Sequence, residues 1–204
     1  MATTVLGLAR RARLTSLVER HDSTAVLGLF ALVNGLIAIG AIACVALVTG
    51  EPLLFPSLGP TAFLLFYTPM QPAASPRNTV CGHAIGAGAG YLALVVFGLT
   101  GDAPALASEV TGARVGAAAL ALGLTSGAMV WAHVPHPPAG ATTLIVALGI
   151  LHEPRQLAVL MVAVVLMVIQ GFVINRLAGI DYPLWTPASS GEAVDVAGPP
   201  GPVT

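Results

Sequence analysis

Charged residues are scarce in this chain of 204 residues, at 8% of the total. A soluble domain carries about 25% charged residues. Hydrophobic residues make up 56%, and the mean hydropathy is +0.88. A fully water-exposed surface cannot be built from so few charged residues. We therefore expect lipid to solvate much of the protein. The formal net charge of −1 gives no basic field for nucleic acid, which excludes nucleic-acid binding as a function.

Cysteines and enzyme motifs are also scarce. The two cysteines, Cys44 and Cys81, lie inside apolar segments and are expected to be small buried hydrophobes rather than a disulfide or metal cluster. No P-loop, G-x-S-x-G, H-E-x-x-H or dinucleotide fingerprint occurs. The chain's histidines lack a carboxylate or thiolate spaced to complete a metal site. We therefore expect no enzyme, no metal and no cofactor.

The two ends of the chain differ from its middle. Residues 1–24 hold an arginine cluster and are therefore expected to be a cytoplasmic segment. The apolar run that follows is too long for a cleaved signal peptide. Residues 189–204 are rich in Gly and Pro, and we expect a disordered tail. The Ala/Gly-rich composition favours a bacterial inner membrane.

Long and short apolar segments alternate along the chain. Four are long enough to span a bilayer: residues 25–49, 78–99, 110–131 and 156–178. Two short ones, residues 56–67 and 137–151, follow prolines and would extend only roughly 18 to 22 Å as helices, against a hydrocarbon core of about 30 Å. The sequence therefore predicts an all-α membrane protein in which the order long helix, half-helix, long helix occurs twice.

An offset of 81 residues, from Pro56 to Pro137, superposes the two halves and predicts an internal repeat. The first membrane repeat would cover residues 25–99 and the second residues 106–180. If the half-helices only re-enter the membrane, the chain crosses four times and the repeats are parallel. If each half-helix crosses together with an extended stretch, there are six crossings and the repeats are inverted. We favour six, because the N-terminal arginines, Arg77 and Arg176 then share the cytoplasmic side.

The starts of the two half-helices are the strongest candidate for a binding site. A helix N-terminus has unpaired N–H groups and a partial positive charge, and inverted repeats bring two such ends to one site near the membrane midplane. Glycine would admit a ligand to the bare backbone, and hydroxyl groups could add donors. These residues are Ser57, Gly59, Thr61, Gly140, Thr142 and Thr143. The alternative is that Pro and Gly only delimit the helices, while the hydroxyls bond their own backbone.

Several other polar residues are candidates. His136, directly before the second half-helix, could donate to an anion or carry a proton with it, or could simply cap the helix. His83 could face the same cavity or pair with a hydroxyl. Arg77 and Asn78 begin a long segment, where Arg77 could attract an anion or extend to lipid headgroups; Arg114 has the same two interpretations.

Three stretches of the sequence resemble the HPP membrane proteins, named for a His-Pro-Pro motif. They are His136-Pro137-Pro138-Ala139-Gly140-Ala141-Thr142, Pro76-Arg77-Asn78 followed by Gly82-His83, and Phe55 to Ala62. Family members more often have Ala and Ser where this chain has Pro60 and Thr61. The resemblance implies a compact membrane protein, usually described with four transmembrane helices, and implies nitrite transport, the activity associated with plastid and cyanobacterial members.

These observations lead to one main hypothesis and two rivals. The first is transport of a small inorganic anion, nitrite first, with or without a coupled proton. A membrane scaffold or sensor subunit would instead use the glycine-spaced helix faces, such as Gly82, Gly86 and Gly90, to bind a partner. An intramembrane enzyme would use His136 and His83. The sequence leaves open whether the glycine faces meet within one chain or between two copies, in which case the protein would be a homo-oligomer.

Overall fold

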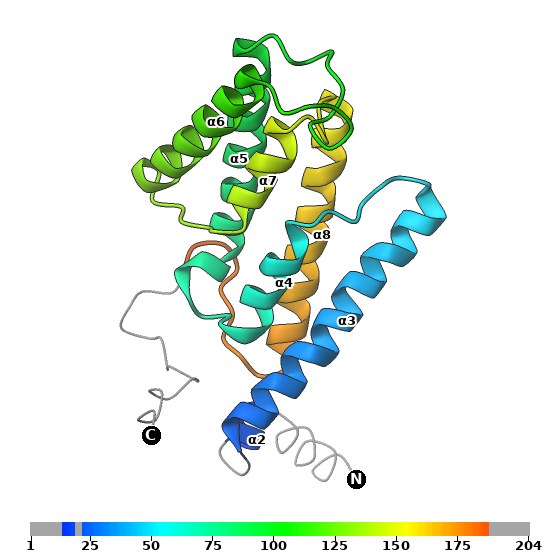
Figure 1. Ribbon diagram of the computed structural model, residues 1–204. Coiled ribbons are helices and arrows are strands. Elements are labelled where there is room, and N and C mark those ends of the chain that lie inside the picture. Colours follow the sequence, from blue (N-terminus) through cyan, green and yellow to red (C-terminus); the bar gives the residue numbers. More distant parts are fainter. Residues whose placement is uncertain (1–13, 19–21, 188–204) are drawn as a thin grey trace, which may run out of the picture.

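The computed structural model describes residues 14–18 and 22–187, and this part of the chain is helical with no strand (Figure 1). The arginines at positions 10, 11, 13 and 20 and the tail from residue 189 lie outside the described residues. The elements are α2 (Leu14–Val18), α3 (Ser23–Thr49), α4 (Leu58–Tyr67), the 3₁₀ turn η1 (Pro72–Ala74), α5 (Pro76–Val96), α6 (Gly112–Trp131), α7 (Ala139–Ala147) and α8 (Pro154–Leu177).

Local sequence signals set the boundaries of the long helices. Asp22 caps α3 by accepting from the Thr24 N–H at 2.9 Å, and Gly50 ends it in the left-handed conformation, at φ 70°. The Ser75 and Thr111 side chains cap α5 and α6 in the same way. At α8, Pro154 stands in the first turn behind a capping box of Glu153 and Gln156.

The four long helices are those expected from the sequence. Each contains an apolar window long enough to cross a membrane: α3, α5, α6 and α8. Large apolar side chains on their outer faces are exposed, such as Leu36 at 69% and Val48 at 88%. Lipid solvates such faces, whereas water would not, so the protein is an integral membrane protein.

The half-helices are shorter than expected. They begin at Leu58 and Ala139, two residues after the first proline of each stretch, and α7 ends at Ala147 rather than near Leu151. The early end of α7 has a local cause, because Gly149 takes a left-handed φ of 79° and turns the chain away. The shorter lengths leave neither half-helix able to cross a bilayer alone.

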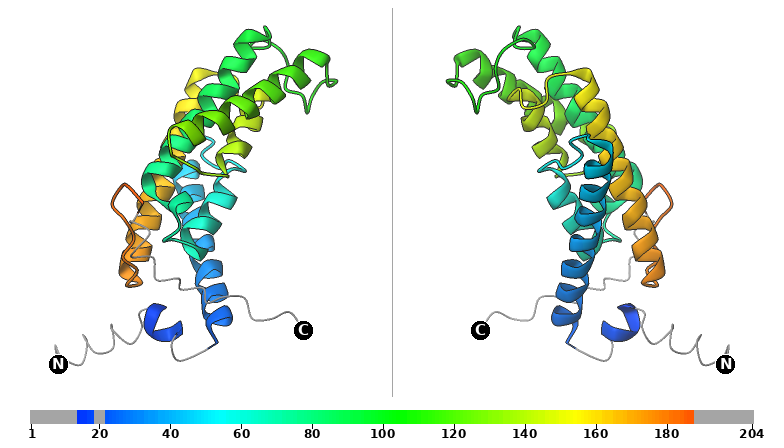
Figure 2. Two further views of the ribbon diagram at one scale, coloured as in Figure 1. Left: turned by 90° about the vertical axis from the view of Figure 1, so that its left-hand side faces the viewer. Right: turned by 90° about the vertical axis from the view of Figure 1, so that its right-hand side faces the viewer.

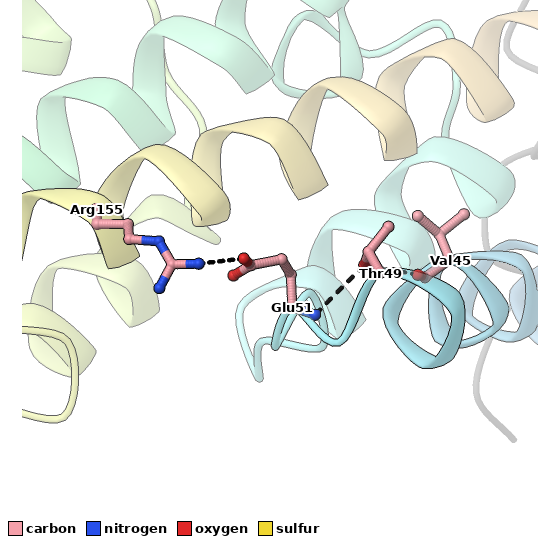
Figure 3. A network of polar contacts seen from close by, with 4 residues as sticks. All are labelled: Val45, Thr49, Glu51 and Arg155. Atoms are coloured by element: carbon pink, nitrogen blue, oxygen red, sulfur yellow. Dashed lines mark hydrogen bonds and ion pairs between the residues drawn. The ribbon is translucent and has the colours of Figure 1, made fainter.

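Hydrogen bonds define two ends of the molecule. At one, here called the Glu51 end, Arg155 of α8 pairs with Glu51, and the Glu51 N–H and the Val45 carbonyl both bond to the Thr49 hydroxyl (Figure 3). The Ala105 N–H, after α5, donates to the carbonyl of Leu148, after α7, at 2.9 Å. α7 therefore ends on the same side as α5, and the start of α6 joins them there through Arg114.

The opposite end is called the Tyr182 end. There the Leu14 N–H donates to the Ala178 carbonyl at 3.0 Å, and Tyr182 donates to the Ala74 carbonyl at 2.5 Å. Asn175, near the end of α8, donates to the Leu65 carbonyl, near the end of α4, at 2.9 Å. α4 thus ends at the Tyr182 end, whereas α7 ends at the Glu51 end.

The two half-helices run in opposite directions from the middle of the molecule. In Figure 1, α4 descends from mid-height and α7 rises from it, and both side views place the teal α4 below the yellow-green α7 (Figure 2). Helix order is long, half, long, twice along the chain, as the sequence suggested. The internal repeat and its inversion stay predictions.

The glycine face of α5 packs against α7 inside one chain. A Cβ built on Gly82 would lie 2.6 Å from the His136 Cβ, and one on Gly86 would lie 2.7 Å from the Ala139 carbonyl oxygen. Gly90 is equally close to Val146. For these three glycines, the question left open by the sequence is answered: the small-residue face allows a half-helix to approach its own chain's α5.

Arg114 is buried, at 3% exposed, so its side chain does not extend to lipid headgroups, one of its two predicted interpretations. Its guanidinium donates to the carbonyls of Ala103, at 3.0 Å, and Ala147, at 3.4 Å. Ala147 is the last residue of α7, where a cation is stabilised by the negative end of the helix dipole. Arg114 therefore fastens α7 to the Glu51 end.

We expect Arg114→Met to lower the free energy of unfolding by about 1.5 to 3 kcal/mol, because hydrogen bonds from a charged donor are lost. Arg155→Met is the matched control. Its partner Glu51 lies at the surface and the Arg155 side chain is 75% exposed, so the cost should be about 0 to 1 kcal/mol. Thermal unfolding in detergent compares the two; equal shifts would contradict the assignment of Arg114.

Candidate functional site

Four buried polar side chains meet where the half-helices begin. Thr61 comes from the first turn of α4, His83 from the second turn of α5, His136 from the loop before α7, and Thr142 from the first turn of α7. All four are 0% exposed. Segments far apart in sequence thus form one polar cluster inside an apolar protein; we call it the His83–His136 cluster.

The hydrogen bond of His136 to the backbone determines its tautomer. Its Nδ1 lies 2.7 Å from the Ala73 carbonyl oxygen, which can only accept, so Nδ1 carries a hydrogen. In the neutral ring, Nε2 is then an unprotonated acceptor. This nitrogen lies 3.2 Å from the His83 Nε2 and 3.4 Å from the Thr61 Oγ1.

His83 completes a chain of hydrogen bonds. Two ring nitrogens at 3.2 Å need one hydrogen between them, and since the His136 Nε2 is bare, the hydrogen belongs to the His83 Nε2. That N–H also lies 3.0 Å from the Thr61 Oγ1. The His83 Nδ1 is consequently an acceptor, and the Thr142 hydroxyl donates to it at 2.7 Å. The two rings are 4.8 Å apart between centroids and tilted by 60°.

The threonines predicted as donors have different partners. Thr61 donates to the Ser57 carbonyl at 2.9 Å and accepts from the N–H at Nε2 of His83. The bond to Ser57 agrees with the alternative in which hydroxyls bond their own backbone. Thr143 donates to the Ala139 carbonyl at 3.0 Å and lies 2.8 Å from the hydroxyl of Thr125 on α6. Thr143 therefore serves the contact between α7 and α6, and no hydrogen bond joins it to the imidazoles.

Ser57 is the exception among the hydroxyls predicted as donors; outside that set, the buried Thr79 hydroxyl of α5 also has no partner. It stands at the N-cap of α4, is 0% exposed, and its hydroxyl has no hydrogen-bond partner in the structure. A buried hydroxyl without a partner costs about 1 to 3 kcal/mol, so its presence calls for an explanation. Because Ser57 precedes Thr61 by one helical turn, its hydroxyl is a spare donor beside the cluster.

The backbone N–H groups at the half-helix starts are paired with carbonyls in this conformation. The Leu58 N–H donates to Phe55 at 2.9 Å, and those of Ala139 and Gly140 donate to His136 and Pro137 at 3.0 Å. Bare N–H groups facing a ligand were expected at both starts, and at these three positions that expectation is wrong. The prolines cause it, because they preset the turn that lets the chain close tight i to i−3 bonds before the helix.

Both predicted glycines have room around them. A Cβ on Gly59 would have no atom within 4 Å, and one on Gly140 would meet only Leu122, at 3.6 Å. Next to them an apolar groove of about 350 Å³ separates the two half-helix starts. It is lined by Pro60, Phe63, Leu64, Pro137, Pro138 and Ala141.

Arg77 and Asn78 hold the loop that carries His136. The Arg77 guanidinium donates to the His133 carbonyl at 2.6 Å, and the Asn78 amide donates to Pro72 at 2.9 Å and to Pro135 at 3.5 Å. Together with the Ala73 bond to His136, these contacts tie the loop to η1 and the start of α5. Both residues position the site; no contact joins their side chains to the cluster.

The other histidines lie apart from the cluster. His133 is exposed and adopts a left-handed φ of 53° at the turn after α6, and His152 bonds to Gly149. Within the described ranges, no group of three or more His, Cys, Asp or Glu side chains could hold a metal ion.

Sequence reasoning missed two parts of the site. The Ala73 carbonyl defines the His136 tautomer, and Tyr182, which is buried, holds the adjacent Ala74. A backbone carbonyl has no sequence signature. The single signal for Tyr182 was a tyrosine just after the last apolar segment.

Helices that only lipid can solvate, closed around a buried polar cluster, define an integral membrane protein with a polar site in its interior. The chain belongs to the HPP transmembrane family: the family model described as "HPP, transmembrane region" matches residues 21–183. This confirms the family resemblance carried by the His-Pro-Pro stretch.

One relative can be compared directly. A curated transmembrane protein of Dictyostelium discoideum is 31% identical over 138 residues, which are 65% of this chain and 45% of that protein. The chain therefore corresponds to less than half of the relative's length. No solved structure matches the chain.

Proposed function

We propose that this protein transports a small monovalent inorganic anion, with nitrite as the first candidate, through the His83–His136 cluster. One observation carries the proposal: four fully buried polar side chains from α4, α5, α7 and the loop before α7 converge between two oppositely directed half-helix starts. Polar and titratable groups at membrane depth are costly and are functional by default. Nitrite itself rests on the resemblance to nitrite transporters in the family.

The anion would replace hydrogen bonds that the cluster now makes with itself. In this conformation the polar groups satisfy one another, so the cluster is closed. Opening it would free the imidazoles and Thr61 toward the spare hydroxyl of Ser57, at the positive end of the α4 dipole. The opposite half-helix, α7, would contribute the Thr142 hydroxyl from the other side.

Six crossings are part of the proposal. Since α4 and α7 end at opposite ends of the molecule, each can complete a crossing with the extended stretch before it, residues 50–57 and 132–138. The two ends of the described part, near Leu14 and Tyr182, would then lie on the same side. Arg77 and Arg176 lie toward that end, so we place it in the cytoplasm of a bacterial cell.

The two imidazoles take a transport role here, and no catalytic one is proposed. A scaffold or sensor role has one observation in its favour, the open apolar groove beside the half-helices with Phe63 57% exposed. That role predicts stable capture of a partner and no flux by the purified protein, which the experiment below distinguishes from transport.

Nitrite flux into liposomes should fall by roughly tenfold or more in Thr142→Val, because His83 loses its hydroxyl partner and an unpaired buried acceptor costs about 1 to 3 kcal/mol. Thr143→Val is the matched control: the same substitution, one residue away, removes a buried hydroxyl that bonds to α6 instead. It should leave flux within about threefold of the wild type once both proteins are shown to be folded.

The comparison has two ways to fail. Wild-type protein that is folded and moves no nitrite, nitrate, formate or chloride would contradict transport. Equal loss in the two variants would show that the cluster around His83 is no more important for transport than the contact between α6 and α7.

A further inference from the structure

Each polar hydrogen in the His83–His136 cluster is already in use. Thr142 donates to His83, His136 donates to Ala73, Thr61 donates to Ser57, and the remaining hydrogen of His83 lies between His136 and Thr61. The closed cluster is therefore neutral and offers no N–H or O–H to an incoming anion. Ser57 supplies one spare hydroxyl at its edge, and nothing there supplies charge.

Within residues 14–18 and 22–187, no hydrogen bond joins an arginine to the cluster, so none is in place to compensate for the charge of an anion. The described arginines lie near the helix ends: Arg77 on a loop carbonyl, Arg114 on the end of α7, and Arg155 and Arg176 in surface pairs. An unpaired charge taken out of water costs far more than hydroxyl groups return. The site needs one positive charge and one further donor, and a single added proton would provide both.

We propose that the His83–His136 pair binds one proton together with each monovalent anion, so that transport is electroneutral symport with a ratio of one to one. The inference rests on the proposed anion site. The proton would enter from the same aqueous side as the anion and bind the bare Nε2 of His136. No covalent bond to the anion forms or breaks, and proton and anion leave together, so no net charge crosses the membrane.

Protonation changes the contact between the two rings. With a hydrogen on each Nε2, the 3.2 Å contact between these nitrogens becomes a repulsion, and the rings must separate. Both N–H groups would then be free to donate to the oxygens of an anion bound between the separated rings. Two positive rings could not remain so close, which limits the pair to one additional proton.

Carboxylates are absent from the described helices. Asp22, Glu51, Asp102, Glu109, Glu153 and Asp181 all lie between or beyond them. The half-helix α7 has no titratable side chain, and α4 has only the exposed Tyr67. The remaining titratable groups of the described residues are Cys44 on α3, Cys81 and Tyr91 on α5, the arginines already named, His133 and His152, which lie apart from the cluster, and Tyr182.

Tyr182 is the one titratable group attached to the cluster's backbone. It donates to Ala74, next to the carbonyl that binds His136. Burial raises the pKa of Tyr182 above its ordinary value, so the phenol keeps its proton at neutral pH. It therefore holds η1 in place and does not exchange protons with the pair.

The test measures nitrite and proton movement together in liposomes containing the wild-type protein, with a luminal pH dye and the potential clamped by potassium and valinomycin. In one-to-one symport, an external pH one unit below the luminal pH should drive nitrite to accumulate about tenfold inside, since one pH unit is worth about 1.4 kcal/mol. It also predicts luminal acidification on nitrite entry and no response to the potential. Protein-free liposomes correct for nitrous acid that crosses lipid unaided.

Three results would decide the matter. Accumulation that follows the pH step supports the inference. Nitrite flux that follows the potential and ignores the pH step overturns the coupling but leaves the proposed function intact. No flux from folded protein overturns both.

His136→Gln assigns the proton to the pair. A glutamine amide can place an oxygen near the position of the bare Nε2 but cannot gain a proton, so the residual nitrite flux should reach the same level with and without the pH step. His152→Gln, on a histidine outside the cluster, should accumulate nitrite about tenfold like the wild type. Full pH-driven accumulation by folded His136→Gln would show that the proton is carried elsewhere.

Discussion

Gly86→Val should destabilise the protein by about 1 to 3 kcal/mol or prevent its folding, and should lower the midpoint of thermal unfolding by roughly 5 °C or more. A Cβ at this position would lie 2.7 Å from the Ala139 carbonyl oxygen and 2.9 Å from the Thr143 hydroxyl. The first obstacle is backbone at the first residue of α7, which cannot rotate away. The half-helix would have to leave α5, and the loop with His136 would move with it.

Gly88→Val on the same helix is the control. Gly88 is exposed, and a Cβ there would have no atom within 4 Å. The same loss of backbone freedom applies to both positions, so propensity alone predicts equal effects. Detergent-solubilised protein would be compared by thermal unfolding and size-exclusion chromatography. If Gly88→Val is as damaging as Gly86→Val, the contact between α5 and α7 does not set the stability.

The long helices were predictable from the sequence because their signals are local. A run of apolar residues, a capping side chain such as Ser75 and a first-turn proline such as Pro76 act within a few residues of one another. The structure moves those boundaries by only a few residues. The half-helices were recognised from their shortness and their prolines, and the same prolines also closed the N–H groups that were expected to be free.

The assembly of the site was beyond reach of the sequence. His83 and His136 are 53 positions apart, and their contact depends on how deep α7 sits on α5. That depth depends on Gly82 and Gly86. The sequence predicted that they belong to a small-residue face for close helix contact, but not which helix contacts it. Arg77 and Asn78 were predicted as substrate-binding candidates from their place at the start of a long segment. In the structure they hold the loop before α7 and η1 through backbone carbonyls, and the sequence has no signal for these bonds.

The contact between α5 and the start of α7 therefore determines both the helix packing and the geometry of the His83–His136 cluster. The glycines of α5 admit the start of α7, and this brings the rings of His83 and His136 within hydrogen-bond distance. Arg114 fastens the other end of α7, so both ends of the half-helix are held. A conformational change that separates α5 from the loop would have to break the ring contact together with the bonds from Arg77 and Asn78.

His136→Ala should reduce nitrite flux by roughly ten- to a hundredfold, because it removes the Nε2 acceptor that faces the His83 N–H and leaves the Ala73 carbonyl without its donor. Each such loss costs about 1 to 3 kcal/mol. Part of that cost falls on folding, so alanine alone does not separate stability from transport.

His136→Asn separates them. An asparagine amide can donate to the Ala73 carbonyl from near the position of Nδ1, which preserves the link to η1, but it has nothing at the position of Nε2. The variant should therefore unfold within a few degrees of the wild type and still lose flux by roughly tenfold or more. His152→Asn, at a histidine bonded only near its own turn, should keep both. Because the Nε2 of His136 is where the cluster meets His83, wild-type flux in folded His136→Asn would show that the contact between the two rings is structural and that the anion passes by another route.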